Sequence, residues 1–478
     1  MFMRKYCPHW IVSLTLLTSA GARADFPVHP CRQVDVKGWV AELPQDQASC
    51  PAPSAAWRMR SFKLDETRTL CSYEWKSSSS PTHVGLPHGL DYSADCMAVG
   101  VSTKDAPFHS QPDIPVSDNL ADVEADFLDA LDAPKLSIPI RASIALDFPT
   151  LAFIDAEPVP ARVPQLGAIQ HGNSLSTLAE LLGGCDHVPC KFRQGWYGEP
   201  ALFPFAYGQV VGSPLDTAQA LDSAVAGLRP EAEQHIVYSI GLGFEADADC
   251  DALPNSPVVA ALRESIRRAA CANDAIVIAP VGNIRPDDVT IGMLYPAAFQ
   301  NEQLVCDGVK QGRPLVAAIS GVDGQLHPLS TSRANAQLMT IGGPWAHAGP
   351  PEERLNPRTA SSVAVAAAGP LISLAWWMRP DLDAKQLLET LRHSGSDTQP
   401  STKGSVLKVC PALRALCSDK KQGRCSELQS LCPARLEAKT PRMIVAPPAA
   451  APAPSPGSTP LTSCVGRGQR LDPYDPGE

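Results

Sequence analysis

The chain lacks an excess of basic residues. Its 478 residues include 40 Lys and Arg against 50 Asp and Glu, which gives a formal net charge of -10. A surface that binds nucleic acid, or a polybasic segment that anchors a protein to an anionic membrane, needs the opposite balance. We therefore expect no nucleic acid partner and no polybasic membrane anchor. Hydrophobic residues make up 44% of the chain, which is enough to build a packed core.

The chain also lacks a long apolar run. Residues 11–20 (IVSLTLLTSA) are fewer than the ~20 apolar residues that a membrane-spanning helix needs, and no later segment reaches that length without a charge or a proline. Arg4 and Lys5 precede this run, and residues 22–24 (ARA) follow it with a small-x-small cleavage site. This arrangement is typical of a secretory signal peptide. We therefore predict a cleaved signal over residues 1–24, a secreted or periplasmic mature chain that starts at Asp25, and no membrane span.

Cysteine is not scarce, and whether the cysteines form disulfide bonds depends on the compartment of the protein. Fifteen cysteines are present, and Cys7 leaves with the signal peptide. The even number that remains in an oxidising compartment predicts disulfide bonds. Zinc is the alternative at Cys185, His187 and Cys190, but a second C-x-x-C half is missing. No carboxylate cluster marks a calcium site, so we expect no metal ligands and no cofactor. Bridges are expected inside the groups Cys31, Cys50, Cys71 and Cys96; Cys185, Cys190, Cys250, Cys271 and Cys306; and Cys410, Cys417, Cys425 and Cys432, with Cys464 standing apart.

Composition divides the chain into six pieces. Residues 25–103 hold four cysteines and many turns, which predicts a small disulfide-stapled unit. Residues 399–440 hold four cysteines but few large apolar residues, so we expect this segment to bury little surface and to depend on its bridges. The division is 1–24 signal peptide, 25–103 cysteine-containing unit, 104–140 acidic Pro-rich linker, 141–398 main domain, 399–440 Cys-rich segment and 441–478 Pro/Ala-rich tail.

Apolar strand-like runs alternate with helix-like stretches over residues 141–398. This alternation predicts an α/β domain with a mainly parallel sheet. Pro370 falls inside one expected helix, where a proline forces a kink or costs ~3 kcal/mol. The expected strands are Leu151–Ile154, Ile236–Ile240, Ala275–Ala279 and Leu315–Ile319. The expected helices are Ser174–Leu182, Val258–Ala270, Ser362–Trp377 and Asp383–His393, with a further one over Asn119–Leu131 in the linker.

Four polar residues stand where these elements begin or end. Asp155 directly follows the first strand, and ligands of open α/β sheets bind beyond the carboxyl ends of the strands. His171 precedes a helix-like run that starts at the same crevice. Asn283 follows a strand and a glycine, where its amide can direct a donor into the crevice. Ser362 begins a helix whose dipole and free backbone N–H groups would support a nucleophile. Taken singly, each residue also fits a helix cap, a loop or a turn.

The order Asp, His, Asn, Ser resembles that of the subtilisin-like serine protease family, the subtilases. The resemblance extends over residues 141–398 through several motifs. Residues 236–243 (IVYSIGLG) are similar to the family's strand and S-L-G substrate edge, with Gly241 in place of the serine. The other matches are residues 152–155 (AFID) to the strand that ends in the family's Asp, 278–283 (IAPVGN) to A-A-G-N, 295–298 (YPAA) to Y-P-A, 321–325 (GVDGQ) with 329–332 (LSTS) to V-D-x-x-G…F-S-x, and 378–388 (MRPDLDAKQLL) to P-x-L-T-x-x-Q-V.

The resemblance implies a subtilisin-like three-layer α/β domain, flanked by small disulfide-rich segments, that hydrolyses peptide bonds in a protein or peptide substrate. Asp155, His171 and Ser362 would form the catalytic triad, and Asn283 would contribute to the oxyanion hole. Residues Gly241, Leu242 and Gly243 would pair with an extended substrate peptide. The 25–103 unit becomes a candidate propeptide or inhibitor-like domain.

Two choices stay open on the sequence. The family's G-T-S-x-A motif corresponds to residues 360–364 (ASSVA), which fits Ser362 as the nucleophile. Ser361 is the alternative, and it would put Val363 at the position of the alanine. The chain also departs from the family after the aspartate, where Ala156 and Glu157 replace S/T-G. The alternative function is therefore a pseudoprotease that binds peptides, and a third is a secreted disulfide-rich interaction protein.

Overall fold

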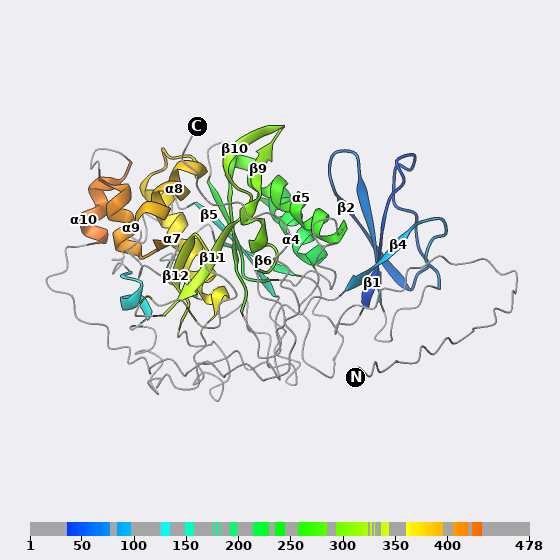
Figure 1. Cartoon of the computed structure of the whole chain (residues 1–478), viewed down its shortest axis with the longest axis horizontal. Helices are drawn as coiled ribbons and strands as arrows, with labels where there is room; N and C mark the ends of the chain where they lie inside the picture. The colour runs from blue at the N-terminus through cyan, green and yellow to red at the C-terminus, as the bar shows by residue number, and fades with distance from the viewer. Residues whose placement is uncertain are drawn as a thin grey trace, which may run out of the picture.

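The structure is a computed structural model, and it forms a large α/β unit beside a smaller all-β unit (Figure 1). The signal peptide, most of the linker and the Pro/Ala-rich tail lie outside the residues that it describes. These residues are 36–76, 84–96, 125, 127–133, 149–156, 175, 178, 179, 182, 192–197, 214–228, 235–243, 257–283, 293–323, 326, 329, 336–343, 360–394, 405–418 and 423–432.

A seven-stranded sheet forms the centre of the α/β unit. Its strand order is β13-β12-β11-β8-β7-β5-β6, and every pairing is parallel. The inner strands are continuous apolar runs, as expected when helices cover both faces of a parallel sheet. The strands are β5 (Thr150–Ala156), β6 (Phe192–Tyr197), β7 (Ile236–Ile240), β8 (Ile276–Pro280), β11 (Ala317–Val322), β12 (Leu338–Ile341) and β13 (Ser405–Val406). The predicted α/β fold with a mainly parallel sheet is confirmed.

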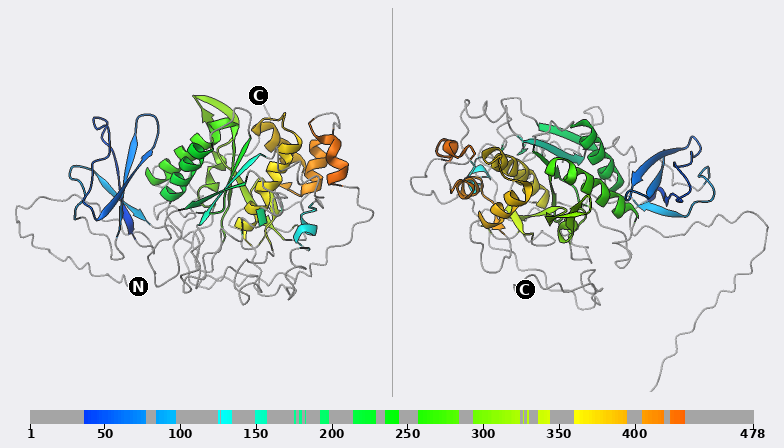
Figure 2. Two further views of the ribbon diagram at one scale, coloured as in Figure 1. Left: turned by 180° about the vertical axis from the view of Figure 1, so that it is seen from behind. Right: turned by 90° about the horizontal axis from the view of Figure 1, so that it is seen from above.

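Helices cover both faces of this sheet, and each strand contributes to two cores. On β5, Leu151 and Phe153 lie in the core that contains helix α7, whereas Ala152 and Ile154 lie in the core that contains α4 and α5. This follows from the alternation of side chains along a strand. The sheet therefore lies between two helix layers (Figure 2). One layer is α4 (Pro214–Gly227) and α5 (Pro257–Cys271), and the other is α7 (Ser361–Met378), α8 (Ala384–Ser394) and α9 (Val409–Leu416).

Helix α7 is the central helix of its layer. All of its 18 residues are buried, and it is the only helix in the described part of the chain that is long and apolar enough to cross a membrane. Its complete burial marks it as a core helix. A Cβ at Gly369 would lie 3.1 Å from Leu151 Cδ1 and 3.2 Å from Ser239 Oγ, so glycine lets the helix approach β5 and β7 closely. The helix continues through Pro370 without a break.

The all-β unit is an antiparallel sheet of four strands in the order β2-β3-β1-β4. One face carries Trp39, Tyr73 and Tyr92 and forms a core of its own, closed by the disulfide between Cys50 and Cys71. Such a small core benefits from a covalent bridge. The strands are β1 (Val36–Glu42), β2 (Trp57–Lys63), β3 (Thr69–Trp75) and β4 (Tyr92–Cys96).

The other face of the small sheet packs against α4 and α5. Val40, Phe62 and Leu70 belong to the same buried core as the residues of these two helices. An ion pair crosses the interface, since Arg60 Nη1 donates to Asp216 Oδ1 at 2.6 Å, and both side chains are largely buried. The two units therefore share a continuous apolar and ionic contact.

The segment after residue 399 is packed into the α/β core. Strand β13 extends the main sheet beside β12. On α9, Val409, Leu413 and Leu416 are buried in the core that contains α7. The segment thus buries more surface than its composition suggests, because its few large apolar residues recur at helical spacing on one face. Two nested disulfides, Cys410–Cys432 and Cys417–Cys425, link α9 to the following η5 (Cys425–Glu427) and α10 (Leu428–Leu431).

A disulfide-linked hairpin completes the α4/α5 side. It consists of β9 (Gln303–Cys306) and β10 (Val309–Pro314), and Cys306 is bonded to Cys271 at the end of α5. Short 3-10 helices precede β8 and β9, namely η3 (Ala272–Asp274) and η4 (Ala297–Asn301). All four disulfides among the described residues join cysteines of the same sequence group, as predicted.

Most predicted elements of the main domain agree with the structure. Strand β7 has the predicted bounds, and β8, α5, α7 and α8 differ from prediction by one residue at each end. Strand β11 begins two residues later than predicted and extends to Val322. Of the predicted helix Asn119–Leu131, residues 125 and 127–130 are described as helical. Helix α4, the β9–β10 hairpin and the strands β6, β12 and β13 were not predicted. Strand β12 has four residues, and β6 and β13 lie at the two edges of the main sheet.

Candidate active site

Asp155 lies near the carboxyl end of β5, as predicted. Its side chain is completely buried, and its backbone pairs with Trp196 of β6. Strand β7 lies on its other side, where the Gly241 N–H donates to the Ile154 carbonyl at 2.8 Å. A Cβ at Gly241 would collide with Asp155 Oδ2. The carboxylate thus occupies the space that a side chain at position 241 would need.

Asn283 is held against the start of α7 by Ser361. Its Oδ1 accepts hydrogen bonds from the Ser361 backbone N–H at 2.9 Å and from the Ser361 hydroxyl at 3.1 Å. The Ser361 hydroxyl in turn accepts a bond from the Gly282 N–H at 3.2 Å. Gly282 has φ +96°, a conformation that glycine adopts without a steric penalty. A backbone N–H can only donate, so Oδ1 is the end of the amide that faces Ser361, and the donor Nδ2 is the other end.

Ser361 and Ser362 differ in their surroundings. Ser361 is 0% exposed, and its hydroxyl is used in the bonds with Asn283 and Gly282, whereas Ser362 is 6% exposed. Both lie in the first turn of α7, whose backbone N–H groups have no partners within the helix. The Ser361 N–H is bonded to Asn283. The arrangement therefore makes Ser361 an anchor and leaves Ser362 as the better nucleophile candidate of the two.

The turn before α7 accommodates the residue that differs from the family motif. Ala360 has φ −159° and ψ 156°, an extended conformation that any residue adopts. Its backbone N–H donates to the Gly342 carbonyl at 2.8 Å. Alanine in place of the family's glycine is thus compatible with this backbone, and the start of the helix is fixed to the end of β12.

The predicted substrate edge, residues 241–243, continues β7 beyond its last residue. Leu242 is buried, and a Cβ at Gly243 would lie 2.8 Å from Leu294 Cδ1. Leu294 also contacts the end of β8, since its N–H donates to the Val281 carbonyl at 3.0 Å.

Tyr295 follows Leu294, and its ring packs edge-to-face on the ring of Phe299, with 4.8 Å between the ring centroids. Burial raises the pKa of Tyr295, so the phenol is neutral at physiological pH. The 293–299 segment therefore packs beside residues 241–243 and the end of β8.

The structure places two pairs of neighbouring residues among those predicted for the site. Asp155 contacts Gly241, and Asn283 contacts Ser361 next to Ser362, all at the carboxyl ends of the central strands. His171 lies outside the described residues. Leu175, four residues after it, is described, and it lies 3.5 Å from the Cβ position of Gly241.

The sequence interpretation missed one role and one contact. It weighed Ser361 only as a rival nucleophile, although the backbone N–H and the hydroxyl of Ser361 both bond to Asn283. It also assigned Gly241 to substrate binding and did not predict that Gly241 packs against the Asp155 carboxylate. Among the described residues, no group of three or more His, Cys, Asp or Glu side chains gathers as a metal site would require.

Comparisons with known proteins give weak likenesses. No protein-family model and no curated protein matches the sequence. Solved structures of subtilisin-like serine proteases and subtilase toxins resemble the fold. A structure of the subtilase cytotoxin SubAB assembly is 16% identical with a TM-score of 0.41, covering 64% of this chain and 97% of that chain. The epidermin leader peptide processing serine protease EpiP from Staphylococcus aureus is 11% identical with a TM-score of 0.45, covering 80% of this chain and 99% of that chain.

A cold adapted subtilisin-like serine proteinase is 12% identical with a TM-score of 0.37, covering 54% of this chain and 88% of that chain.

Proposed function

We propose that this protein is an exported serine endopeptidase that hydrolyses peptide bonds in protein or peptide substrates. The proposal rests on the two hydrogen bonds that Ser361, the residue directly before Ser362, donates to Asn283 Oδ1. These residues lie at the sheet edge where the strand that carries Asp155 ends. A nucleophile at a helix start, an amide donor beside it and a buried carboxylate on a nearby strand are the parts that acyl transfer requires.

The proposed mechanism uses these parts in order. Ser362 Oγ attacks the carbonyl carbon of the scissile peptide, and His171 accepts the hydroxyl proton and later donates it to the leaving amine. Asp155 orients the imidazole and stabilises its cation. Asn283 Nδ2 and the Ser362 backbone N–H hold the oxyanion of the tetrahedral intermediate. Water then repeats the attack on the acyl-enzyme with His171 as the base, which restores Ser362.

Two departures from the family pattern are compatible with this proposal. Ala360 stands in a backbone conformation that needs no glycine, and Gly241 leaves room for the Asp155 carboxylate. Four disulfides among the described residues fit an oxidising compartment, which supports export through the predicted signal peptide of residues 1–24. N-terminal sequencing of the exported protein should find Asp25 first.

The N-terminal unit is proposed as a separate domain within residues 25–103. Its sheet packs on α4 and α5 and has a core and a disulfide of its own. A propeptide or inhibitor-like role suits a unit that has its own core and packs on the catalytic domain through one face of its sheet. Residues 104–140 would be the connecting linker, and 141–398 the catalytic domain.

A fluorescent phosphonate probe that reacts with activated serines tests the proposed activity. We expect the intact mature protein to be labelled at Ser362, as located by peptide mapping, and labelling to be lost on prior denaturation. A folded protein that is not labelled, and that binds unfolded polypeptide without cleaving it, would instead support the pseudoprotease alternative. The departure at Ala156 and Glu157 is the sequence feature that favours this alternative.

A further inference from the structure

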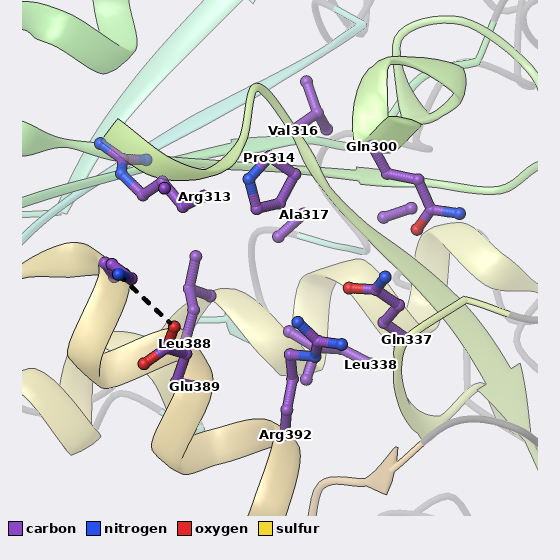
Figure 3. A pocket seen from close by; sticks show the side chains of 13 residues that line it. Gln300, Arg313, Pro314, Val316, Ala317, Gln337, Leu338, Leu388, Glu389 and Arg392 are labelled. Atoms are coloured by element: carbon purple, nitrogen blue, oxygen red, sulfur yellow. Dashed lines mark ion pairs between the residues drawn. The ribbon is translucent and has the colours of Figure 1, made fainter. Parts of the chain in front are cut away.

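A pocket lies at the amino ends of β11 and β12, between these strands, η4 and helix α8 (Figure 3). The candidate active site lies at the carboxyl ends of the same sheet. A strand rises about 3.3 Å per residue, and β11 separates the two ends by six residues. The pocket is therefore distinct from the candidate active site, and the proposed protease function does not use it.

The pocket combines an apolar floor with basic side chains. Pro314, Val316, Leu338 and Leu388 are apolar residues of its lining, and Pro314 is the least buried of the four. Three cationic residues line it against one carboxylate, that of Glu389. This local basic excess stands out in a chain whose net charge is -10.

The three cations are engaged to different degrees. Arg313 is almost completely buried, and its Nη2 bonds Asp274 Oδ1 at 3.0 Å. The charge of Arg313 is thereby offset, although its buried Nε has no hydrogen-bond partner among the described residues. Lys385 faces Glu389 at 3.9 Å, and both of these side chains are about half exposed.

Arg392 is the cation that is available to a ligand. Within the part of the chain that the structure describes, its guanidinium makes no ion pair. Figure 3 shows Arg392 reaching from α8 toward Gln337 and Leu338, across the pocket from Gln300. A guanidinium presents paired donors that match the two oxygens of a carboxylate, and the amide of Gln337 can add a further donor.

The size of the pocket suits a carboxylate group. Its volume is about 40 Å³, and one water molecule needs about 10–15 Å³ by this measure, so about three heavy atoms fit. A carboxylate has three heavy atoms, and apolar atoms attached to it would extend out of the pocket past Pro314, which is only partly buried.

We propose that this pocket binds the carboxylate of a ligand that carries an apolar tail. Arg392 binds the two oxygens, Gln337 donates to one of them, and the apolar atoms next to the carboxylate lie against Pro314. The ligand is either a free monocarboxylic acid or the C-terminal residue of a peptide, because both present the same chemistry. The site does not depend on the protease proposal.

Isothermal titration calorimetry of the intact mature protein tests this site with three probes. Isovalerate represents the free acid, N-acetyl-leucine represents a peptide C-terminus, and N-acetyl-leucine amide lacks the charge. We expect saturable one-site binding of at least one acid and binding of the amide at least tenfold weaker. Which of the two acids binds more tightly identifies the source of the carboxylate.

Variants then locate the binding. Arg392→Gln should weaken binding of the acid about tenfold, which corresponds to about 1.4 kcal/mol, and Gln337→Leu should weaken it less. Lys310→Gln is the matched control, because Lys310 is exposed on β10 outside the pocket lining and should not change affinity. Arg392 and Gln337 are exposed, so circular dichroism should find both variants folded.

Several results would overturn the proposal. The first is that neither acid shows saturable binding up to about 10 mM, a range in which even a millimolar site saturates. The second is that the amide binds as tightly as the acids. The third is that Arg392→Gln leaves the affinity for the acid unchanged. Equal weakening by Lys310→Gln would do the same, because it would indicate a general charge effect.

Discussion

Asn283 Oδ1 receives two hydrogen bonds from Ser361, one from the backbone N–H at 2.9 Å and one from the hydroxyl at 3.1 Å. This pair joins the loop after β8 to the first turn of α7, elements that are 78 residues apart in the chain. The contact fixes which end of the amide is the acceptor. The donor end of Asn283 therefore points away from Ser361, which is compatible with its proposed role as a donor to the oxyanion.

The two serines should respond differently to replacement by alanine. Ser362→Ala should abolish phosphonate labelling, because it removes the proposed nucleophile. Ser361→Ala should keep labelling but slow it, and it should lower the free energy of unfolding by about 1–3 kcal/mol because the buried Gly282 N–H loses its acceptor. Peptide mapping and chemical denaturation measure the two effects. If Ser361→Ala abolishes labelling while Ser362→Ala retains it, the nucleophile is Ser361.

Asn283→Ala should affect the transition state more than substrate binding. Loss of one oxyanion donor typically lowers kcat by about 100- to 1000-fold, while KM should change little. Steady-state kinetics on a cleaved peptide would measure both constants. Ser361→Thr is the matched control, since it keeps a hydroxyl for Asn283 and should retain most activity. A rise in KM with unchanged kcat would contradict the oxyanion role.

Gly241→Ala should disturb Asp155. The new Cβ would collide with Asp155 Oδ2, and overpacking of this kind typically costs about 1–3 kcal/mol. Displacement of the carboxylate should also slow phosphonate labelling. Gly227→Ala is the control, because a Cβ there meets nothing within 4 Å and an alanine in helix α4 is favourable. Thermal unfolding and labelling rates together test this, and equal behaviour of the two variants would refute the packing argument.

The ion pair between Arg60 and Asp216 should hold the N-terminal sheet on α4. Arg60→Met leaves Asp216 largely buried without this partner, and breaking a buried pair from one side typically costs about 3–5 kcal/mol. We expect faster hydrogen exchange in β1, β2 and β3 but not in β8. Arg60→Met combined with Asp216→Leu should recover much of the loss, because the pair is replaced by apolar packing. Slow exchange in the single variant would mean that the apolar contacts suffice.

Reduction should loosen the segment after residue 399 before it unfolds the sheet. The bridges Cys410–Cys432 and Cys417–Cys425 restrict the unfolded chain, and one bridge typically contributes about 2–4 kcal/mol. Limited proteolysis with and without reductant should give faster cleavage in the 405–432 region only when the reductant is present. Two hydrogen bonds should limit how far the reduced segment loosens. Arg379 donates to the Leu416 carbonyl at 2.8 Å, and Arg424 donates to the Trp377 carbonyl at 2.9 Å. Equal cleavage in both conditions would show that packing alone holds the segment.

Local sequence patterns were sufficient for the central elements of the fold. Strand β7 is a continuous apolar run and α5 has apolar residues at helical spacing, so short-range periodicity determines them. Strands β12 and β13 have four and two residues, and they pair with each other across the part of the chain that contains α7 and α8. Their existence depends on the sheet edge that they complete, which no local pattern encodes.

The sequence by itself determined the residue types at the site and their order: Asp155, His171, Asn283 and Ser361–Ser362. Short motifs carry this information, because a strand that ends in an acid or a helix that starts at a serine is a local feature. Only the tertiary structure decided that Ser361 anchors Asn283 and that the Asp155 carboxylate fills the space beside Gly241. Both contacts join segments that are more than 70 residues apart, and their geometry is set by the parallel sheet that brings the strand ends to one edge.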